Sequence, residues 1–573
     1  MIGVTMKGSR LGRSIIGQVT SLIMGSFIVR YLVWLIAILY TIINLAAWSY
    51  SQNVLNLFIA DSLQNTLTLI AAILSVVGLY DVIQKKHTLL RTYPVIGHLR
   101  YIFELVRPEF RQYFFEGEND YLPFSRAQRS LIYQRAKQQS SEKPFGTLLD
   151  VYEPDYEFIS HSVKPVPQAS PDTFRVWVGG DQCKQPYSAS IFNISAMSFG
   201  SLSANAIRAL NKGAKLGGFY HDTGEGSISP YHLEFGADIV WELGSAYFGC
   251  RNAEGRFDPE IFARQAALAN VKMIEIKLSQ GAKPGHGGIL PKEKITPQIA
   301  AVRGIPMTED CISPASHSTF STPLELMHFV QRLRELSLGK PIGFKLCIGQ
   351  PWEFMGIVKA MLETGILPDY IVVDGAEGGT GAAPMEFANH IGAPMREGLL
   401  FVHNTLVGVK LRDQIKLGAA GKVVSAFDII RAFALGADWV NAGRGFMFAL
   451  GCIQSLSCNT NKCPTGIATQ SDSRQKALVV EDKGERVYHF HRNTLHALAE
   501  MIAAAGLSHP DEIEAHHVVR RFSATEIKTY AQTLFFLKRG ALLAEHIESD
   551  FYRESWNAAS SATFHRQSSL SKA

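Results

Sequence analysis

Gly436-Ala-Asp-Trp-Val-Asn-Ala-Gly443-Arg444-Gly445-Phe-Met-Phe-Ala-Leu-Gly451 reads as a short apolar strand, a glycine-rich turn and the start of a helix. The same order recurs upstream, where apolar segments alternate with helical stretches. The eight predicted strands, most of which end in small or polar residues, are 191–197, 218–222, 239–243, 273–278, 341–347, 370–373, 414–418 and 439–442. Eight such units over roughly 270 residues predict an α/β fold, a closed (β/α)8 TIM barrel, which typically needs about 250 residues.

An open, doubly wound sheet is the alternative fold. That fold favours a G-x-G-x-x-G sequence after the first strand, where the phosphates of a dinucleotide bind. This chain has Ala196-Met-Ser-Phe-Gly-Ser at that position, which does not match. The barrel is therefore the preferred prediction.

Three cysteines follow the opening stretch, at C-x5-C-x4-C closed by a proline: Cys452, Cys458, Cys463 and Pro464. Clustered thiolates suit iron–sulfur or zinc, but structural zinc normally takes four ligands and no fourth cysteine or histidine is near. Three thiolates fit a cluster of three irons, with one iron per cysteine. Three ordinary buried cysteines remain the simpler interpretation.

The predicted strand ends carry glycine-rich loops, as expected of a barrel whose chemistry lies at the C-terminal ends of its strands. Gly421-Lys422 and Gly443-Arg444 follow strands seven and eight, where such barrels commonly hold phosphate. The loop 374–384 after strand six contains Gly378 and Gly379, and so many glycines indicate a flat aromatic cofactor against the backbone. A phosphate site next to a thiolate cluster suggests a flavin that exchanges electrons with iron–sulfur.

Other strand ends carry charged residues that could bind a carboxylate substrate. Glu225 stands between two glycines, so a ligand can approach it closely, although a plain turn residue is an equally good interpretation. Gln280 and Lys283 lie in a second glycine-rich loop, and Arg303 could add bidentate carboxylate recognition. Lys345 ends strand five, where a cation could neutralise the pyrimidine edge of a reduced flavin.

The N-terminal region contains two long uncharged stretches, 31–48 and 62–80, that are each about the length a bilayer requires. Trp34, Trp48 and Tyr50 could sit at the membrane interfaces. No lysine or arginine separates the two stretches, and several basic residues follow the second. The positive-inside rule then predicts a multi-pass membrane protein whose catalytic domain faces the cytoplasm. A cleaved signal sequence ending near residue 30 and a buried helical hairpin are the alternatives.

We expect four regions: a membrane anchor at 1–85, a helical collar at 86–185, the barrel at 186–505 and an amphipathic helical tail at 506–573. The net charge of +5 is too small to argue for nucleic acid as a partner. The seven cysteines do not look like a disulfide framework.

Taken together, these motifs resemble the synthase domain of glutamate synthase, and more closely the shorter, membrane-anchored FMN-binding glutamate synthase family without an amidotransferase domain. The resemblance runs from about residue 88 to 545 and is densest from 190 to 475. Its most specific pieces are Ala196-Met-Ser-Phe-Gly-Ser, Thr223-Gly-Glu-Gly, Gln280-Gly-Ala-Lys-Pro-Gly, residues 374–384 and residues 452–466.

The resemblance implies an FMN-linked barrel with a 3Fe-4S cluster beside the flavin, ligated by Cys452, Cys458 and Cys463. The residues that it places around FMN are Ala196, Met197, Ser198, Lys345, Gly378, Gly379, Gly421, Lys422, Gly443 and Arg444. The positions that match the 2-oxoglutarate site are Glu225, Gln280, Lys283 and Arg303, with Glu225 or Lys283 handling protons.

The implied activity is that of an oxidoreductase acting on CH–NH2 donors, which aminates a 2-oxo acid reductively in glutamate biosynthesis. Two departures qualify it: His286 and Ile289 replace a glutamate and a glutamine of the long enzymes, so the identity of the 2-oxo acid is open. Neither a glutamine-hydrolysing domain nor an NAD(P)H fingerprint is expected, so ammonia and electrons would come from elsewhere, the electrons from ferredoxin or a reductase subunit. Amino-acid oxidation at the membrane and a non-catalytic flavin-binding scaffold are the alternatives.

Overall fold

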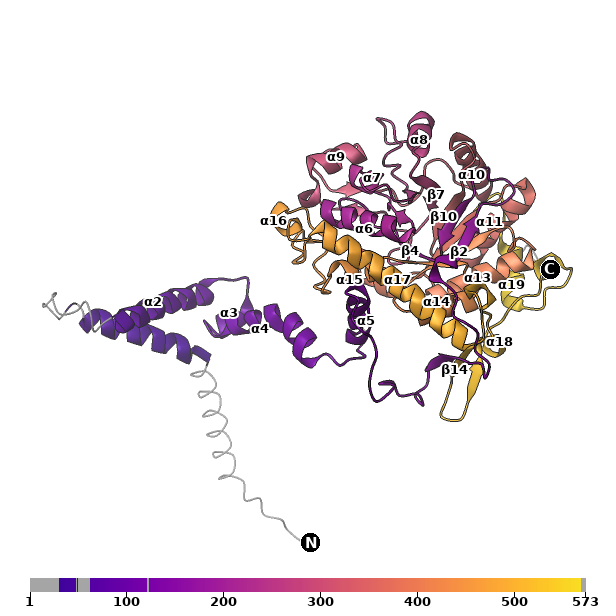
Figure 1. Ribbon diagram of the computed structural model, residues 1–573. Helices are drawn as coiled ribbons and strands as arrows, with labels where there is room; N and C mark the ends of the chain where they lie inside the picture. Colours follow the sequence, from indigo (N-terminus) through magenta and orange to yellow (C-terminus); the bar gives the residue numbers. More distant parts are fainter. Residues whose placement is uncertain (1–29, 48, 50–61, 121–122, 568–573) are drawn as a thin grey trace, which may run out of the picture. The chain divides into compact units, whose positions relative to one another are not determined.

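The computed structural model describes residues 30–47, 49, 62–120 and 123–567 (Figure 1). The chain forms two compact units, residues 1–118 and residues 119–573. The boundary falls inside the expected collar, whose residues are therefore divided between the two units. Of the residues expected at membrane interfaces, Trp48 and Tyr50 lie outside the described part of the chain.

Among its described residues, the N-terminal unit contains two helices that are long and apolar enough to cross a membrane, Arg30–Ala47 and α2 (Ser62–Ile83). Trp34 Nε1 donates to the carbonyl oxygen of Ser75 at 3.0 Å, which joins the two helices. Three short segments follow, α3 (Thr88–Thr92), α4 (Gly97–Phe110) and the π-helical turn η1 (Arg111–Phe115).

The second unit is built on a closed barrel of eight parallel strands, which confirms the predicted fold. In barrel order along the chain, the strands are β4 (Phe192–Ile194), β5 (His221–Asp222), β6 (Ile239–Leu243), β7 (Val271–Lys277), β10 (Ile342–Leu346), β11 (Tyr370–Asp374), β12 (Lys416–Ala420) and β13 (Trp439–Ala442). The last strand pairs with the first, Val440 opposite Phe192, and this pairing closes the ring. All eight predicted strands are present, with ends that shift by a few residues.

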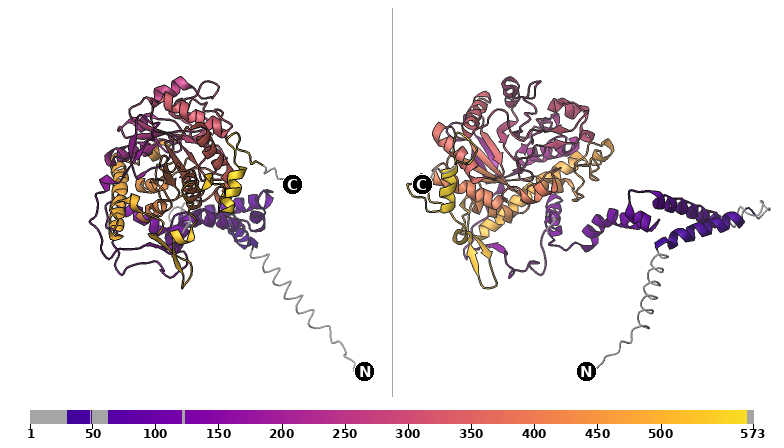
Figure 2. Two further views of the ribbon diagram at one scale, coloured as in Figure 1. Left: turned by 90° about the vertical axis from the view of Figure 1, so that its right-hand side faces the viewer. Right: turned by 180° about the vertical axis from the view of Figure 1, so that it is seen from behind.

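Helices surround the strands, and Figures 1 and 2 show them as an outer layer of the second unit. The main ones are α6 (Ala204–Gly217), α8 (Pro259–Ala266), α10 (Pro323–Leu336), α11 (Pro351–Thr364), α13 (Met395–Gly408), α14 (Ala426–Ala434) and α15 (Arg444–Leu450). Local signals set their ends: Ser203 Oγ accepts from the backbone N–H of Ala206 at the start of α6, and Gly218 ends that helix with φ 64°. The long helix α17 (Val480–Ala504) packs against α6 and against α5 (Arg126–Ala136).

Large aromatic side chains fill the barrel, so it is a packed core and not a pore. The indole N–H of Trp439 donates to the hydroxyl of Tyr220 at 2.9 Å, and that hydroxyl donates to Asn441 Oδ1 at 2.6 Å. A side chain at Gly418 would meet the Trp439 ring at 2.6 Å, which explains a glycine in the middle of β12. These two hydrogen bonds satisfy the indole N–H of Trp439 and the hydroxyl of Tyr220 inside the barrel.

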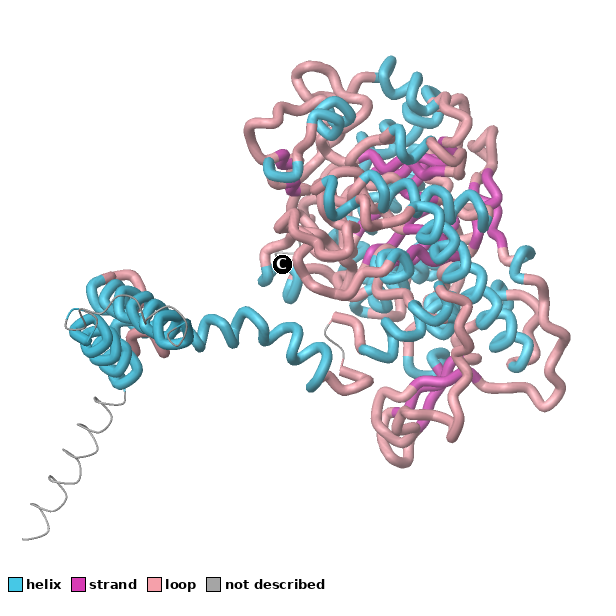
Figure 3. The backbone as a smooth tube through the Cα atoms, turned by 60° about the vertical axis from the view of Figure 1, so that its left-hand side comes forward, coloured by secondary structure: helices cyan, strands magenta, loops and turns pink. Residues whose placement is uncertain are grey.

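In the part of the chain that the structure describes, three small sheets accompany the barrel, and Figure 3 shows their strands apart from it. They are the hairpin β2 (Arg175–Val178) with β3 (Tyr187–Ser190), the hairpin β8 (Ile289–Leu290) with β9 (Cys311–Ile312), and β1 (Glu157–Ile159) with β14 (Val518–Arg521) and β15 (Ile527–Thr529). The expectation of a wholly helical tail is therefore wrong for β14 and β15. Val518 and Val519 are buried there because β14 pairs with β1 across more than 350 residues of sequence, a contact that local periodicity cannot reveal.

Candidate active site

A cavity of about 360 Å³ opens at the C-terminal ends of the barrel strands. The loops that follow six of the eight strands contribute to it, together with side chains of β6 and β10, Phe124 and the cysteine segment. The sequence-predicted residues that line it are Ala196, Met197, Ser198, Glu225, Gln280, Lys283, Lys345, Gly378, Gly379, Gly421, Lys422, Gly443, Arg444, Cys452, Cys458 and Cys463. The structure thus brings nearly the whole predicted set to one site, while the role of each residue stays a prediction.

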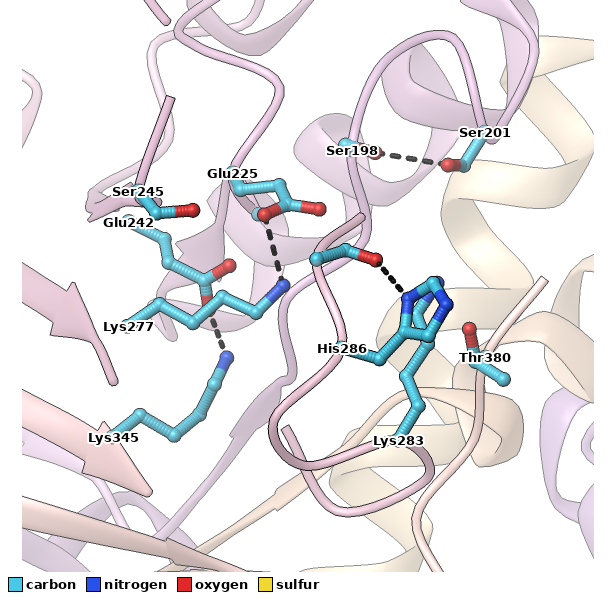
Figure 4. A network of polar contacts seen from close by, with 12 residues as sticks. Ser198, Ser201, Glu225, Glu242, Ser245, Lys277, Lys283, His286, Lys345 and Thr380 are labelled. Carbon is cyan, nitrogen blue, oxygen red and sulfur yellow. Dashed lines mark hydrogen bonds and ion pairs between the residues drawn. The ribbon is translucent and has the colours of Figure 1, made fainter. Parts of the chain in front are cut away.

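Glu225 forms an ion pair with Lys277, whose Nζ lies 3.1 Å from Oε2 (Figure 4). Burial alone would raise the pKa of the Glu225 carboxyl, but Lys277, Arg303 and Lys283 together hold it below its ordinary value. Gly288 lies so close that a Cβ there would stand 1.8 Å from Glu225 Oε1. The carboxylate is therefore ionised at neutral pH and lies against the backbone of the loop after β7.

The loop after β7 carries Lys283, which is buried and donates to the carbonyl oxygen of Ala382 at 2.8 Å. Burial lowers the pKa of its ammonium group, as does the charge of Lys277. Ile289 lines the cavity in the same loop. His286 does not line it: Nδ1 lies 2.9 Å from the carbonyl oxygen of Gly287, and the imidazole packs edge-on against Phe387.

Lys345 lies at the cavity floor, where it forms ion pairs with Glu242 and Glu275, the second at 3.4 Å. Oxygen atoms of Asp222, Glu242 and Glu275 lie within 4.8 Å of one another. Burial and the neighbouring carboxylates raise the pKa of Asp222 well above its ordinary value and that of Glu275 to about 7. Conversely, these carboxylates raise the pKa of Lys345 despite its burial, so the lysine is a permanent cation.

The glycine-rich loops after β12 and β13 place two cations on the cavity wall, Lys422 and Arg444. The Arg444 guanidinium donates to the carbonyl oxygen of Glu377 and lies 4.7 Å from the centroid of the Phe124 ring. Burial lowers the pKa of Arg444 to about 10, which leaves it charged at neutral pH. Two cations beside Gly421 and Gly443 make this wall suited to a phosphate group.

The three cysteines of the C-x5-C-x4-C segment line another part of the cavity wall, and all three are free thiols. The backbone N–H of Gln454 donates to Cys452 Sγ at 3.4 Å. Backbone N–H groups of Thr465, Ile467 and Ala468 and the Thr465 hydroxyl lower the pKa of Cys463 in spite of its burial. The several N–H bonds to Cys463 fit a ligand of an iron–sulfur cluster, whose sulfur atoms are commonly hydrogen-bonded in this way.

Arg303 is the predicted residue that does not line the cavity. It is buried behind the loop after β4, where Nη2 donates to the carbonyl oxygen of Phe199 at 3.0 Å and to Ser198 Oγ at 3.4 Å. Its guanidinium also lies over the Phe248 ring. In this arrangement it holds the loop that carries Met197 and Ser198.

Sequence reasoning missed several polar residues of the cavity wall, among them Lys277, Glu242, Asn441 and Lys294. Lys277 is the last residue of β7, and Glu242 stands next to the end of β6. A charged residue at the end of an otherwise apolar barrel strand is a signal that could have found both. Lys294 carries no such signal, because it lies in a short 3-10 turn and reaches the carbonyl oxygens of Ser201 and Cys458 at 2.7 and 3.3 Å.

Known proteins are similar in sequence to most of this chain. Residues 171–508 match the family model for the conserved region in glutamate synthase. The glutamate synthase large subunit-like protein YerD of Bacillus subtilis is 37% identical over 479 residues, 76% of this chain and 90% of that protein. The archaeal-type glutamate synthase [NADPH] of Thermotoga neapolitana is 35% identical over 315 residues, 55% of this chain and 59% of that protein. With a shared region that contains the whole barrel and the cysteine segment, the chain belongs to the glutamate synthase family of oxidoreductases that act on CH–NH2 donors.

Proposed function

We propose that this protein binds FMN and a 3Fe-4S cluster and catalyses reductive amination of a 2-oxo acid, 2-oxoglutarate or a relative, at a membrane. One observation carries the proposal. A single cavity is lined by a cationic, glycine-rich wall, by the Glu225–Lys277 pair with Lys283, and by three free cysteines. These are the parts that a flavin, a carboxylate substrate and an iron–sulfur cluster require.

The flavin phosphate would lie against Gly421, Lys422, Gly443 and Arg444, and the ring system along Ala196, Met197 and Ser198. The fit is supported by Gly378 and Gly379, which leave room for a flat ring against the backbone, and by the fixed cation at Lys345 on the cavity floor. When bound, FMN supplies a hydride for the carbon of an imine formed from the 2-oxo acid and ammonia.

The substrate would bind through its carboxylate to Lys283, whose lowered pKa reflects a buried and incompletely neutralised cation. Glu225 or Lys283 would exchange protons with the nitrogen or oxygen of the substrate. The overall reaction consumes a 2-oxo acid, ammonia, two electrons and two protons and yields an amino acid and water.

The cluster would be held by Cys452, Cys458 and Cys463 and would pass single electrons between the flavin and an external protein, ferredoxin or a reductase subunit. We expect Cys458→Ser to abolish the cluster signal in electron paramagnetic resonance. Cys183→Ser is the matched control, because Cys183 lies away from the cavity and should leave the signal unchanged. An unaltered spectrum in Cys458→Ser would contradict the ligand assignment.

The two apolar helices would anchor the protein as a membrane hairpin, with both ends and the barrel on the cytoplasmic side. Their lengths, 18 and 21 residues, and the basic residues Lys85, Lys86 and Arg91 after the second helix support this orientation. A membrane anchor also favours the oxidative direction as the second candidate, in which an amino acid is oxidised and its electrons go to a membrane acceptor.

Anaerobic titration of the purified protein tests the activity. We expect dithionite-reduced flavin to be reoxidised by a 2-oxo acid with ammonium, and mass spectrometry to detect the amino acid formed. Bleaching of the oxidised flavin by an amino acid, with no reoxidation by the 2-oxo acid, would support the oxidative direction. Bound flavin that no member of a 2-oxo-acid and amino-acid panel reduces or reoxidises would indicate the non-catalytic scaffold.

A further inference from the structure

The helix α4 (Gly97–Phe110) is amphipathic, and its apolar side is exposed within the N-terminal unit. Leu99, Ile102, Phe103 and Phe110 recur at helical spacing along one side and are 47%, 51%, 65% and 53% exposed. The π-helical turn η1 adds Phe114 and Phe115, 74% and 78% exposed. Contiguous exposed apolar surface of this kind marks an interaction site.

The side of α4 next to this apolar face is basic. Arg100, Arg107 and Arg111 follow one another at spacings of seven and four, and Glu104 lies among them with its carboxylate 3.6 Å from Arg107. Residues 84–112 contain six lysines and arginines, 85, 86, 91, 100, 107 and 111, against two glutamates, 104 and 109. A helix with an aromatic apolar face and a basic polar face is the type that lies in the interface of an anionic membrane.

The start of α4 is fixed to the end of the second apolar helix. The buried carboxylate of Asp81 accepts from the backbone N–H of Val95 at 2.9 Å and lies 2.9 Å from His98 Nε2. Tyr101 packs edge-on against His87, in the basic segment after that helix. These contacts hold α4 where the second helix ends, which in the proposed topology is the cytoplasmic surface of the bilayer.

We propose that α4 and η1 form an interfacial membrane segment, with Leu99, Ile102, Phe103 and Phe110 among the lipid acyl chains and the arginines at anionic headgroups. The inference rests on the membrane anchor proposed above and adds a third contact with the bilayer. An apolar helix face could instead cover a second copy of this chain or residues of the barrel unit. The continuity with the apolar helices and the excess of basic residues favour an anionic lipid surface.

Photocrosslinking in the intact full-length protein tests the proposal. p-Benzoylphenylalanine would replace Phe103 on the apolar side, Glu104 on the polar side, or Ile73 of α2, which is 54% exposed. Membranes carrying each variant would be irradiated, and intact mass measured after purification. We expect adducts of phospholipid mass at positions 103 and 73 and several-fold fewer at position 104.

The outcomes separate the two proposals. Two outcomes would overturn the interfacial segment and leave the anchor intact. One is a crosslink from position 103 to a second copy or to residues 119–573. The other is the absence of a lipid adduct at position 103 while position 73 reacts with lipid. No lipid adduct at either position would overturn both.

A second measurement tests the role of charge. The reference is the adduct yield at position 103 in phosphatidylglycerol-containing vesicles. This yield should fall at least about fivefold in vesicles of phosphatidylcholine alone. It should fall by a similar factor in phosphatidylglycerol-containing vesicles when Arg100→Glu and Arg107→Glu are combined. An equal yield in all vesicles would overturn the assignment of anionic headgroups as the partner of the arginines. Flavin absorbance of each variant checks that the barrel has folded.

Discussion

Lys277 at the end of β7 and Glu225 in the loop after β5 form an ion pair at the cavity wall, with Nζ 3.1 Å from Oε2. Both side chains are largely shielded from solvent, 11% and 16% exposed. A partly buried pair is screened much less than a surface pair, so the charge of Lys277 acts strongly on the carboxyl group. The pair therefore sets the protonation state of the residue we propose to exchange protons with the substrate.

Replacing Lys277 by methionine should raise the pKa of Glu225, because burial raises that pKa and Lys277 is the largest influence that lowers it. We expect the acid limb of the pH profile of kcat/KM to move to higher pH. The measurement is the rate of flavin reoxidation by the 2-oxo acid between pH 5 and 9.

Lys277→Arg is the control for this prediction, since it keeps the charge and should keep the acid limb near its original position. A limb that stays in place in Lys277→Met would show that another group governs the profile. In the same variant, the part of the acid-induced loss of stability that comes from Glu225 should become smaller, because its folded pKa moves up towards or past the unfolded value. A carboxyl whose folded pKa is depressed contributes stability above its unfolded pKa, and that contribution disappears as the pH falls through the folded pKa.

Glu275 should make stability depend on pH in the opposite sense. Burial raises its pKa to about 7 although Lys345 opposes the shift, so the folded protein holds a proton there that the unfolded chain releases near pH 4.5. The stabilising contribution is complete below pH 4.5 and is lost as the pH rises towards 7. Glu275→Gln removes this dependence, so its free energy of unfolding relative to the natural protein should rise by on the order of 2 kcal/mol between pH 5 and pH 8.

Urea unfolding at several pH values measures the Glu275 effect, with Glu254→Gln as the exposed control that should show none. A difference in unfolding free energy that stays constant from pH 5 to pH 8 would contradict the raised pKa.

The sequence predicted the barrel well because most of its strands are short, largely apolar runs that are buried on both faces, as β6 (Ile-Val-Trp-Glu-Leu) shows. The glycine-rich loops and the three cysteines could also be recognised as candidate site residues from the sequence, because their residue types are rare in that order. Two kinds of feature could not be predicted from the sequence. β14 is a strand only because β1 pairs with it from the far end of the chain, and Arg303 faces the backbone of Phe199 because of tertiary packing. Neither contact leaves a local pattern.

Gly288 should not tolerate even a methyl group. A Cβ at this position would stand 1.8 Å from Glu225 Oε1, so Gly288→Ala must displace the carboxylate or the loop. We expect a loss of about 10- to 100-fold in kcat/KM for the 2-oxo acid, since overpacking of this kind typically costs about 1–3 kcal/mol. Gly349→Ala is the matched control, because no atom lies within 4 Å of its added Cβ. Equal activities of the two variants would contradict the close contact between the loop and Glu225.

Arg303 gives the prediction that separates a residue contacting substrate from one that positions a loop. Its guanidinium donates to Phe199 and Ser198, and Ser198 belongs to the segment proposed to lie along the flavin. Arg303→Met should therefore weaken FMN binding about tenfold or more, because hydrogen bonds from charged groups contribute about 1.5–3 kcal/mol each. The dissociation constant, measured by flavin fluorescence on reconstitution of the apoprotein, checks this, with the exposed Arg332→Met on α10 as control. A raised KM for the 2-oxo acid with unchanged FMN affinity would instead place Arg303 at the substrate and contradict the positioning role.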